Sequence, residues 1–286
     1  MSASAAAPEA FLAELPDEPP RPARRRSKGS AALWVVTILG LLYLFIPLIT
    51  IAVFTFNKPS GKFNTVWEGF TLDNWLHPFK EEAFTDALIE SVRVALISCV
   101  LATAIGVLVA LALTRYRMHG GGAINLLLIL PITTPEIVMG ASLFTLFFNQ
   151  GAELGFWTIV IAHTGFCLSF VAMTMKARIR GFDWTLEDAA MDLGSPPMRT
   201  FWKITFPLIL PGIVAAFMLS IALSIDDYII TSFVAGPVRT FPRQVFDASR
   251  VTIPPQAQVL ATMIMLVAII VIVGGTIVSN RRAARG

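Results

Sequence analysis

The sequence has few charged side chains and few of the residues that build catalytic or metal sites. Of its 286 residues, 14% are charged and 55% are hydrophobic, whereas a soluble domain typically carries about 25% charged residues. A water-exposed surface cannot be built from this composition, so an ordinary soluble enzyme is excluded. The two cysteines, Cys99 and Cys167, both lie in apolar runs, which argues against a disulfide or zinc framework.

Signatures of nucleotide binding and catalysis are also missing. The sequence has no Gly-x-x-x-x-Gly-Lys-Ser/Thr run, and its three consecutive glycines, 120–122, are not followed by lysine. The three histidines fall in three different places, and His163, inside an apolar stretch, is assigned no role. We therefore expect a chain without catalytic residues, metal ligands or cofactor, and one that does not bind nucleic acid.

Long apolar stretches are what the sequence does contain. They are continuous rather than alternating, and each is close to the roughly 20 residues that a helix needs to cross a bilayer. The sequence therefore predicts an all-α membrane protein with six transmembrane helices. The predicted organisation is a disordered cytoplasmic tail (1–29), a first transmembrane helix (30–56), an outer loop (57–85), a five-helix core (86–280) and a cytoplasmic C-terminal tail (281–286). The spans within the core are predicted at 86–113, 123–148, 156–175, 206–233 and 257–279.

The distribution of basic residues predicts the orientation. Most of the 22 lysines and arginines lie before the first span, after the second, between the fourth and fifth, and after the last. With six crossings these segments share one side of the membrane, which the positive-inside rule makes the cytoplasm. We expect a multi-pass protein of the cell (inner or plasma) membrane with both termini cytoplasmic.

One cytoplasmic connection, residues 176–205, is long and polar, and it contains a predicted short helix. Thr185 is a good N-cap, and Asp188 three residues later forms an acidic variant of the capping box. Glu187 adds a second acid at the helix N-terminus, and Gly194 is a natural residue to end the helix. A helix of about 8 residues is too short to be stable alone. Its residues leave open whether it packs under its own bundle or docks on another protein.

This segment resembles the EAA loop of ABC importer permeases. The resemblance is carried by Asp188-Ala189-Ala190 followed at the family's spacing by Gly194, Ile204 and Pro207. Asp188 stands where the family usually has glutamate. The resemblance implies a type I ABC importer permease bundle with a short cytoplasmic coupling helix. It assigns the coupling contacts with the ATPase to Thr185, Glu187, Asp188, Ala189, Ala190 and Gly194. It further implies four partners in the bilayer or at its surfaces: a homologous permease subunit, two ATP-binding ATPase subunits and an external solute-binding protein.

Carboxylates inside the predicted membrane region are the candidates for substrate handling. A charged side chain at a helix centre costs about 2.5–3.5 kcal/mol, so such groups usually face a cavity or a partner. Glu136 in the third span, and Asp226 and Asp227 in the fifth, all fall in the outer half. Tyr228 beside them offers an aromatic face to a cation. The alternative is a packing kink in which Glu136 reaches interfacial water or pairs with Arg93.

Two strings around these acids resemble the second permease of spermidine/putrescine importers. They are residues 135–138, Pro-Glu-Ile-Val, and residues 224–231, Ser-Ile-Asp-Asp-Tyr-Ile-Ile-Thr. The resemblance implies a substrate pathway along Glu136, Asp226, Asp227 and Tyr228, and a polyamine as the solute. A cationic solute also suits the acids themselves.

Other functions remain open at this level. Permeases for iron, thiamine, phosphonate or opines share parts of the same pattern. A secondary transporter would use the intramembrane carboxylates as ion carriers. An integral membrane enzyme is disfavoured, because no nucleophile, metal or general-base cluster is evident in the sequence.

Overall fold

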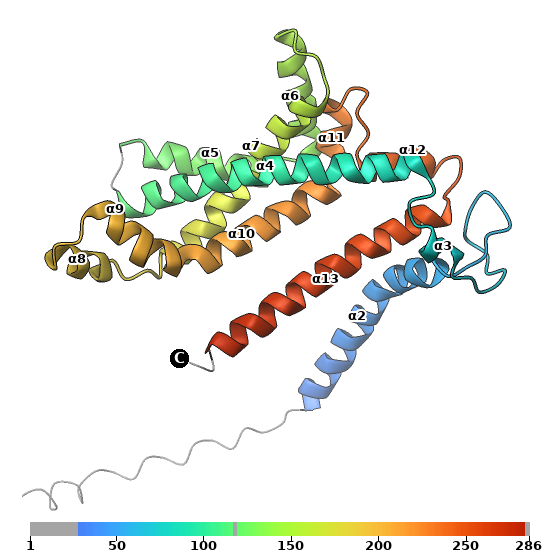
Figure 1. The fold of residues 1–286 in the computed structure, drawn as a ribbon, viewed down its shortest axis with the longest axis horizontal. Helices are drawn as coiled ribbons and strands as arrows, with labels where there is room; N and C mark the ends of the chain where they lie inside the picture. Colours follow the sequence, from blue (N-terminus) through green and yellow to red (C-terminus); the bar gives the residue numbers. More distant parts are fainter. Residues whose placement is uncertain (1–27, 117–118, 284–286) are drawn as a thin grey trace, which may run out of the picture. The chain divides into compact units, whose positions relative to one another are not determined.

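The structure is a computed structural model that describes residues 28–116 and 119–283. The predicted N-terminal tail (apart from its last two residues) and residues 284–286 lie outside this part of the chain. The described residues are mostly helical, with two isolated β-bridges and no longer strand, as Figure 1 shows. The chain divides into two compact units, Met1–Thr50 and Ile51–Gly286. The first unit contributes most of α2, and the second contains the remaining helices.

The predicted all-α, multi-span fold is confirmed. Five helices in the described part are long and apolar enough to cross a membrane, and a bent pair would make a sixth span. The spans are α2 (Lys28–Phe54), α4 (Glu82–Arg115), α7 (Phe156–Ile179), α10 (Phe206–Asp226), α13 (Pro255–Ala283), and the pair α5 (Gly121–Thr133) and α6 (Glu136–Asn149).

Most spans are longer than the hydropathy pattern predicted. The helix α4 begins at Glu82 and ends at Arg115, beyond the predicted 86–113, because charged residues at helix ends can extend toward the interface. At the start of α10, the short α9 (Pro197–Thr200) and the π-helix η1 (Phe201–Thr205) make one continuous 30-residue span with it. The predicted polar connection 176–205 is correspondingly shorter, and it holds α8 (Thr185–Asp192).

The prediction of one continuous third span, 123–148, is wrong. The helices α5 and α6 meet at 111°. Thr134 and Pro135 between them are extended, with ψ angles of 132°. Proline lacks a backbone N–H and disfavours a helical conformation in the residue before it, so the pair Thr134-Pro135 ends α5. Pro131 is accommodated inside α5.

The predicted fifth span, 206–233, is also interrupted. The helix α10 ends at Asp226, the next residue is extended with ψ 118°, and α11 (Ile229–Val234) begins after Tyr228. Two more short helices, α3 (Asp73–Leu76) and α12 (Phe241–Ala248), lie in the segments predicted as outer loops.

The core of the second unit forms where α4 packs along α7 and α10. Small residues permit the close approach of α4 and α7: a Cβ atom on Gly106 would lie 2.8 Å from Val171 Cγ1 and 3.3 Å from the backbone N of Ala172. Figure 1 shows α8 and α9 at the end of the bundle where α4 finishes, with α11 and α12 toward the opposite end. The two regions that contain the predicted site residues are thus separated along the bundle.

The close contact at Gly106 leads to a stability prediction. Gly106→Val is expected to destabilise the chain by about 1–3 kcal/mol, because Val171 is fully buried and has no room to move aside. The matched control is Gly165→Val in α7, where an added Cβ meets nothing within 4 Å. Thermal unfolding of the detergent-solubilised chain measures both variants. Equal melting temperatures for the two would contradict this packing.

Candidate functional site

The interruption of the fifth span is stabilised by the carboxylate of Asp227. Its Oδ2 accepts hydrogen bonds from the backbone N–H of Thr231 (2.8 Å) and from the Thr231 hydroxyl (2.8 Å), and its Oδ1 accepts one from the N–H of Ile230 (3.3 Å). The first N–H groups of any helix have no partner within the helix. Asp227 therefore caps α11 and supplies the hydrogen bonds that the interruption would otherwise leave unmade inside the membrane.

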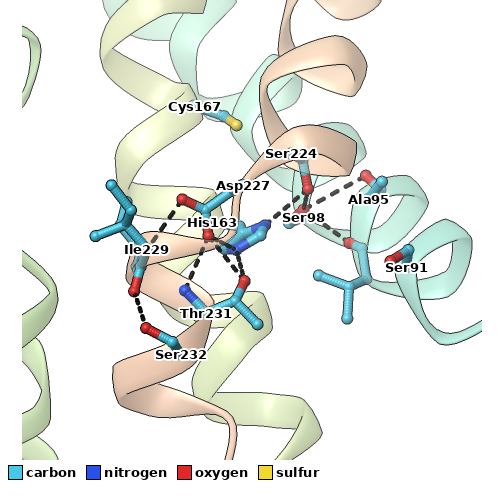
Figure 2. Close-up of polar contacts among 12 residues, drawn as sticks. Ser91, Ala95, Ser98, His163, Cys167, Ser224, Asp227, Ile229, Thr231 and Ser232 are labelled. Carbon is cyan, nitrogen blue, oxygen red and sulfur yellow. Dashed lines mark hydrogen bonds and ion pairs between the residues drawn. The ribbon is translucent and has the colours of Figure 1, made fainter. Parts of the chain in front are cut away.

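A histidine from a different span completes this arrangement. His163 of α7 lies with Nε2 at 3.2 Å from Asp227 Oδ2 and 2.9 Å from Thr231 Oγ1, and with Nδ1 at 2.8 Å from Ser224 Oγ. Its 1% exposure leaves it inaccessible to solvent. Because an ionised carboxylate can only accept, the proton belongs on Nε2. Ser224 is in turn 3.5 Å from the Ser98 hydroxyl on α4, so one polar network joins α4, α7, α10 and α11 (Figure 2).

Sequence reasoning missed His163. The available signal was its position inside an apolar span, since a polar side chain in the membrane needs a hydrogen-bonding partner. That partner, Asp227, is 64 positions away in the chain, and nothing in the sequence identifies it. We call His163, Ser224, Asp227 and Thr231 the buried network.

The neighbouring acids are differently placed. Asp226, the last residue of α10, and Glu136, in the first turn of α6, are both exposed, and within the described part of the chain neither has an ion-pair partner. The helix α10 ends at Asp226, and Asp227 follows it in extended backbone, so the two adjacent side chains have different surroundings. The carboxylate of Asp227 is buried and hydrogen-bonded, whereas that of Asp226 is exposed.

The structure brings Glu136 close to the two aspartates. One turn after Glu136, α6 packs against α11 at Gly140, where an added Cβ would lie 2.6 Å from Phe233 Cδ2 and 3.4 Å from Ile230 Cα. Arg93, considered as a partner for Glu136, instead pairs with Glu90 at 2.8 Å.

Tyr228 lies at the same interruption and is half-buried. Its ring packs against that of Phe246 in α12 at a tilt of 36°, with centroids 4.5 Å apart, and the guanidinium of Arg250 lies over Phe246. Phe246 therefore covers part of the Tyr228 ring.

The second region is the short helix α8, whose start differs from the prediction. Thr185 is its first residue rather than its N-cap, and Asp183 Oδ1 accepts from both the N–H (3.0 Å) and the hydroxyl (2.8 Å) of Thr185. The predicted capping box with Asp188 does not form. Instead, the Asp183 carboxylate, two residues before Thr185, accepts a backbone N–H at the start of the helix.

The end of α8 agrees with the prediction. Gly194 has φ +84°, a left-handed conformation that suits glycine. Its N–H donates to the Met191 carbonyl at 2.9 Å, and the Ser195 N–H donates to the Ala190 carbonyl at 3.1 Å. These two bonds form the Schellman motif that ends many helices.

The residues of α8 divide into an inner and an outer face. Glu187 is buried and directed inward, where its carboxylate pairs with Arg115 at the end of α4 and accepts the hydroxyl of Thr205 at the end of η1. The other face is exposed, and it comprises Thr185, Leu186, Asp188, Ala189, Asp192 and the following Leu193 and Gly194. Of the predicted coupling residues, Glu187 alone is fixed inside the bundle, and Ala190 is half-buried.

The different surroundings of the two aspartates predict different effects on stability. Asp227→Ala is expected to lower the free energy of unfolding by about 1–3 kcal/mol, because it leaves buried donors on Ile230, Thr231 and His163 without an acceptor. Asp226→Ala, one residue earlier and exposed, is the control and is expected to unfold like the wild type. Thermal unfolding in detergent would refute the capping role if both variants behaved alike.

Comparison with known proteins identifies the family. Residues 89–282 match the family described as binding-protein-dependent transport system inner membrane component. The chain is 35% identical over 240 residues to the spermidine/putrescine transport system permease protein PotC of Haemophilus influenzae, covering 84% of this chain and 93% of the relative. It is 34% identical to the putrescine transport system permease protein PotI of Escherichia coli strain K12, covering 81% and 84%.

Solved structures agree with the fold. A bacterial ABC transporter involved in the import of the acidic polysaccharide alginate superposes with a TM-score of 0.65 at 15% identity, covering 89% of this chain and 99% of that chain. With the family match over most of the chain, the conclusion is that this protein belongs to the inner-membrane permease components of binding-protein-dependent transport systems.

Proposed function

We propose that this chain is a permease subunit of an ATP-driven ABC importer that carries polyamines from an external binding protein into the cytoplasm. The observation that carries the polyamine assignment is a pair of exposed carboxylates without salt-bridge partners, Glu136 and Asp226, at the interruptions of two neighbouring spans. Polyamines carry several ammonium groups on a short alkyl chain, so two or more spaced carboxylates complement them. The names of the polyamine permeases that this chain is similar to support the same substrate class.

The three acids then have two roles. Asp226 and Glu136 bind the ammonium groups of the passing solute, because their carboxylates are free. Asp227 stabilises the break between α10 and α11 through the buried network, since its oxygens already accept hydrogen bonds from α11 and contact His163. Tyr228 narrows the same region and offers the uncovered part of its ring to the solute.

The exposed face of α8 is the proposed docking site for the ATPase. Leu193 is 90% exposed and Leu186 46% exposed, and Asp188 and Ala189 lie between them in the chain. Small residues let a partner backbone approach, and exposed leucines beside acids favour a protein interface over water. The chain has no phosphate-binding loop of its own, so two ATPase subunits supply the energy.

The remaining partners follow from the orientation proposed for the chain. With both termini cytoplasmic, α8 faces the cytoplasm, while α3 and α12 face outward. The outer side meets the solute-binding protein. A homologous permease subunit packs beside this chain and closes the pathway on its open side.

The test of this function is ATP hydrolysis by the complete reconstituted complex with its binding protein. Spermidine, putrescine, thiamine, ferric iron and phosphonate are added one at a time. Stimulation by the polyamines alone is the expected result. Stimulation by phosphonate alone would contradict the role of the acids. A rate of ATP hydrolysis that no solute changes would contradict the import function.

Neutralising the free acids is expected to weaken polyamine transport selectively. Glu136→Gln and Asp226→Asn should each lower kcat/KM for spermidine uptake at least tenfold, because each removes one ammonium partner. Glu82→Gln, an exposed acid in the first turn of α4, is the control and should leave uptake unchanged. Uptake at the wild-type rate in both pathway variants would refute this role.

Replacing an exposed leucine tests the docking face. Leu193→Glu is expected to abolish co-purification of the ATPase, because it buries a carboxylate in the interface. Leu76→Glu, in α3, changes another exposed leucine (73% exposed) and should leave the ATPase bound. Retention of the ATPase by Leu193→Glu would place the docking surface elsewhere.

A further inference from the structure

A buried ion pair ties α8 to the end of α4. The Glu187 side chain is 3% exposed and that of Arg115 is 35% exposed. One carboxylate oxygen of Glu187 pairs with Arg115, and the other accepts the Thr205 hydroxyl. A buried carboxylate is tolerated when it is both paired and hydrogen-bonded, and Glu187 meets both conditions.

Aromatic packing holds the pair in one geometry. The guanidinium of Arg115 lies over the Trp184 ring, 5.1 Å from its centroid, and Trp184 packs edge-on against Phe182 at 4.7 Å. Both aromatic rings rest on the apolar cluster that includes Met175 and Ile209. Because Arg115 contacts both the Trp184 ring, just before α8, and the Glu187 carboxylate within it, α8 and α4 are expected to move together.

The helix α4 is suited to carry a displacement across the bundle. It runs without interruption and without proline through its 34 residues, a length of about 50 Å. At its opposite end, Ser91 Oγ accepts the N–H of Phe241 in α12 at 2.8 Å, and Phe84 packs with Phe241 and Leu260 of α13. By contrast, α10 contains Pro211 and follows a π-helix, and the pair α5 and α6 is bent.

We propose that the Arg115–Glu187 pair couples displacement of α8 to α4, so that these two side chains position the bundle during the transport cycle. The proposal rests on the function proposed above, in which α8 docks on the ATPase. The backbone links α8 to α7 and to α9, whereas the ion pair joins α8 to the end of α4 through side chains, in addition to the packing of α4 on α7 and α10. Loss of the pair is therefore expected to weaken the coupling between ATP hydrolysis and movement of α4.

The test uses Glu187→Gln in the reconstituted complex, with spermidine-loaded binding protein as the probe. Glutamine keeps an acceptor for Thr205 and removes the charge opposite Arg115. The expected result is wild-type ATPase association and hydrolysis with at least a tenfold fall in spermidine imported per ATP. The control Glu90→Gln removes the charge from the partly exposed Arg93–Glu90 pair in the same helix and should keep the wild-type ratio.

A double-mutant cycle assigns the effect to the pair. Arg115→Gln removes the partly exposed partner and is expected to uncouple as strongly as Glu187→Gln, and the double variant should be no worse than either. Wild-type import per ATP in Arg115→Gln, or additive losses in the double variant, would overturn the proposal. Loss of the ATPase from the single variants would overturn it too, because the pair would then only shape the docking face. A wild-type complex that imports no spermidine would refute the proposed function instead.

Discussion

Inside a bilayer, every backbone N–H and C=O group needs a hydrogen-bonding partner within the protein, and this constraint governs the two interrupted spans. At the fifth span, Asp227 meets it by capping α11, and His163 anchors that carboxylate to α7. At the third span, Pro135 has no N–H to satisfy, so the chain can turn there between α5 and α6. An exposed carboxylate lies at each break, Glu136 in the third span and Asp226 in the fifth, and the proposed pathway uses these two.

The bundle combines interrupted helices with a continuous one. Glu136, Asp226 and Tyr228 lie at or beside the two interruptions, and they form the solute pathway that we propose. The helix α4 is unbroken and contacts α7 and α10 along its length. Polar contacts tie it to α8 at one end and to α12 at the other. In our account the residues at the interruptions bind the solute, and the continuous helix α4 transmits the motion that releases it.

Much of this fold was predictable because hydropathy, helix length and helix-ending signals are local properties. The apolar runs located the spans but not the breaks within the third and the fifth. Gly194 marked the end of α8 correctly, since its φ of +84° is a conformation that favours glycine. The inward direction of Glu187 was not predictable, because it depends on Arg115, which lies in another span. The partnership of His163 and Asp227 was missed for the same reason. The cap of α8 was placed on Thr185 because two suitable residues, Asp183 and Thr185, are close together in the sequence.

The central claim is that ATP hydrolysis outside this chain drives a polyamine past its free acids. The most direct measurement is uptake of labelled spermidine by proteoliposomes that hold the complete complex, with ATP on the α8 side, binding protein on the other, and ionophores that collapse every ion gradient. The account predicts uptake that persists with ionophores and stops when ATP is withheld. Uptake that continues without ATP and stops with the ionophores would contradict it and indicate an ion-coupled transporter.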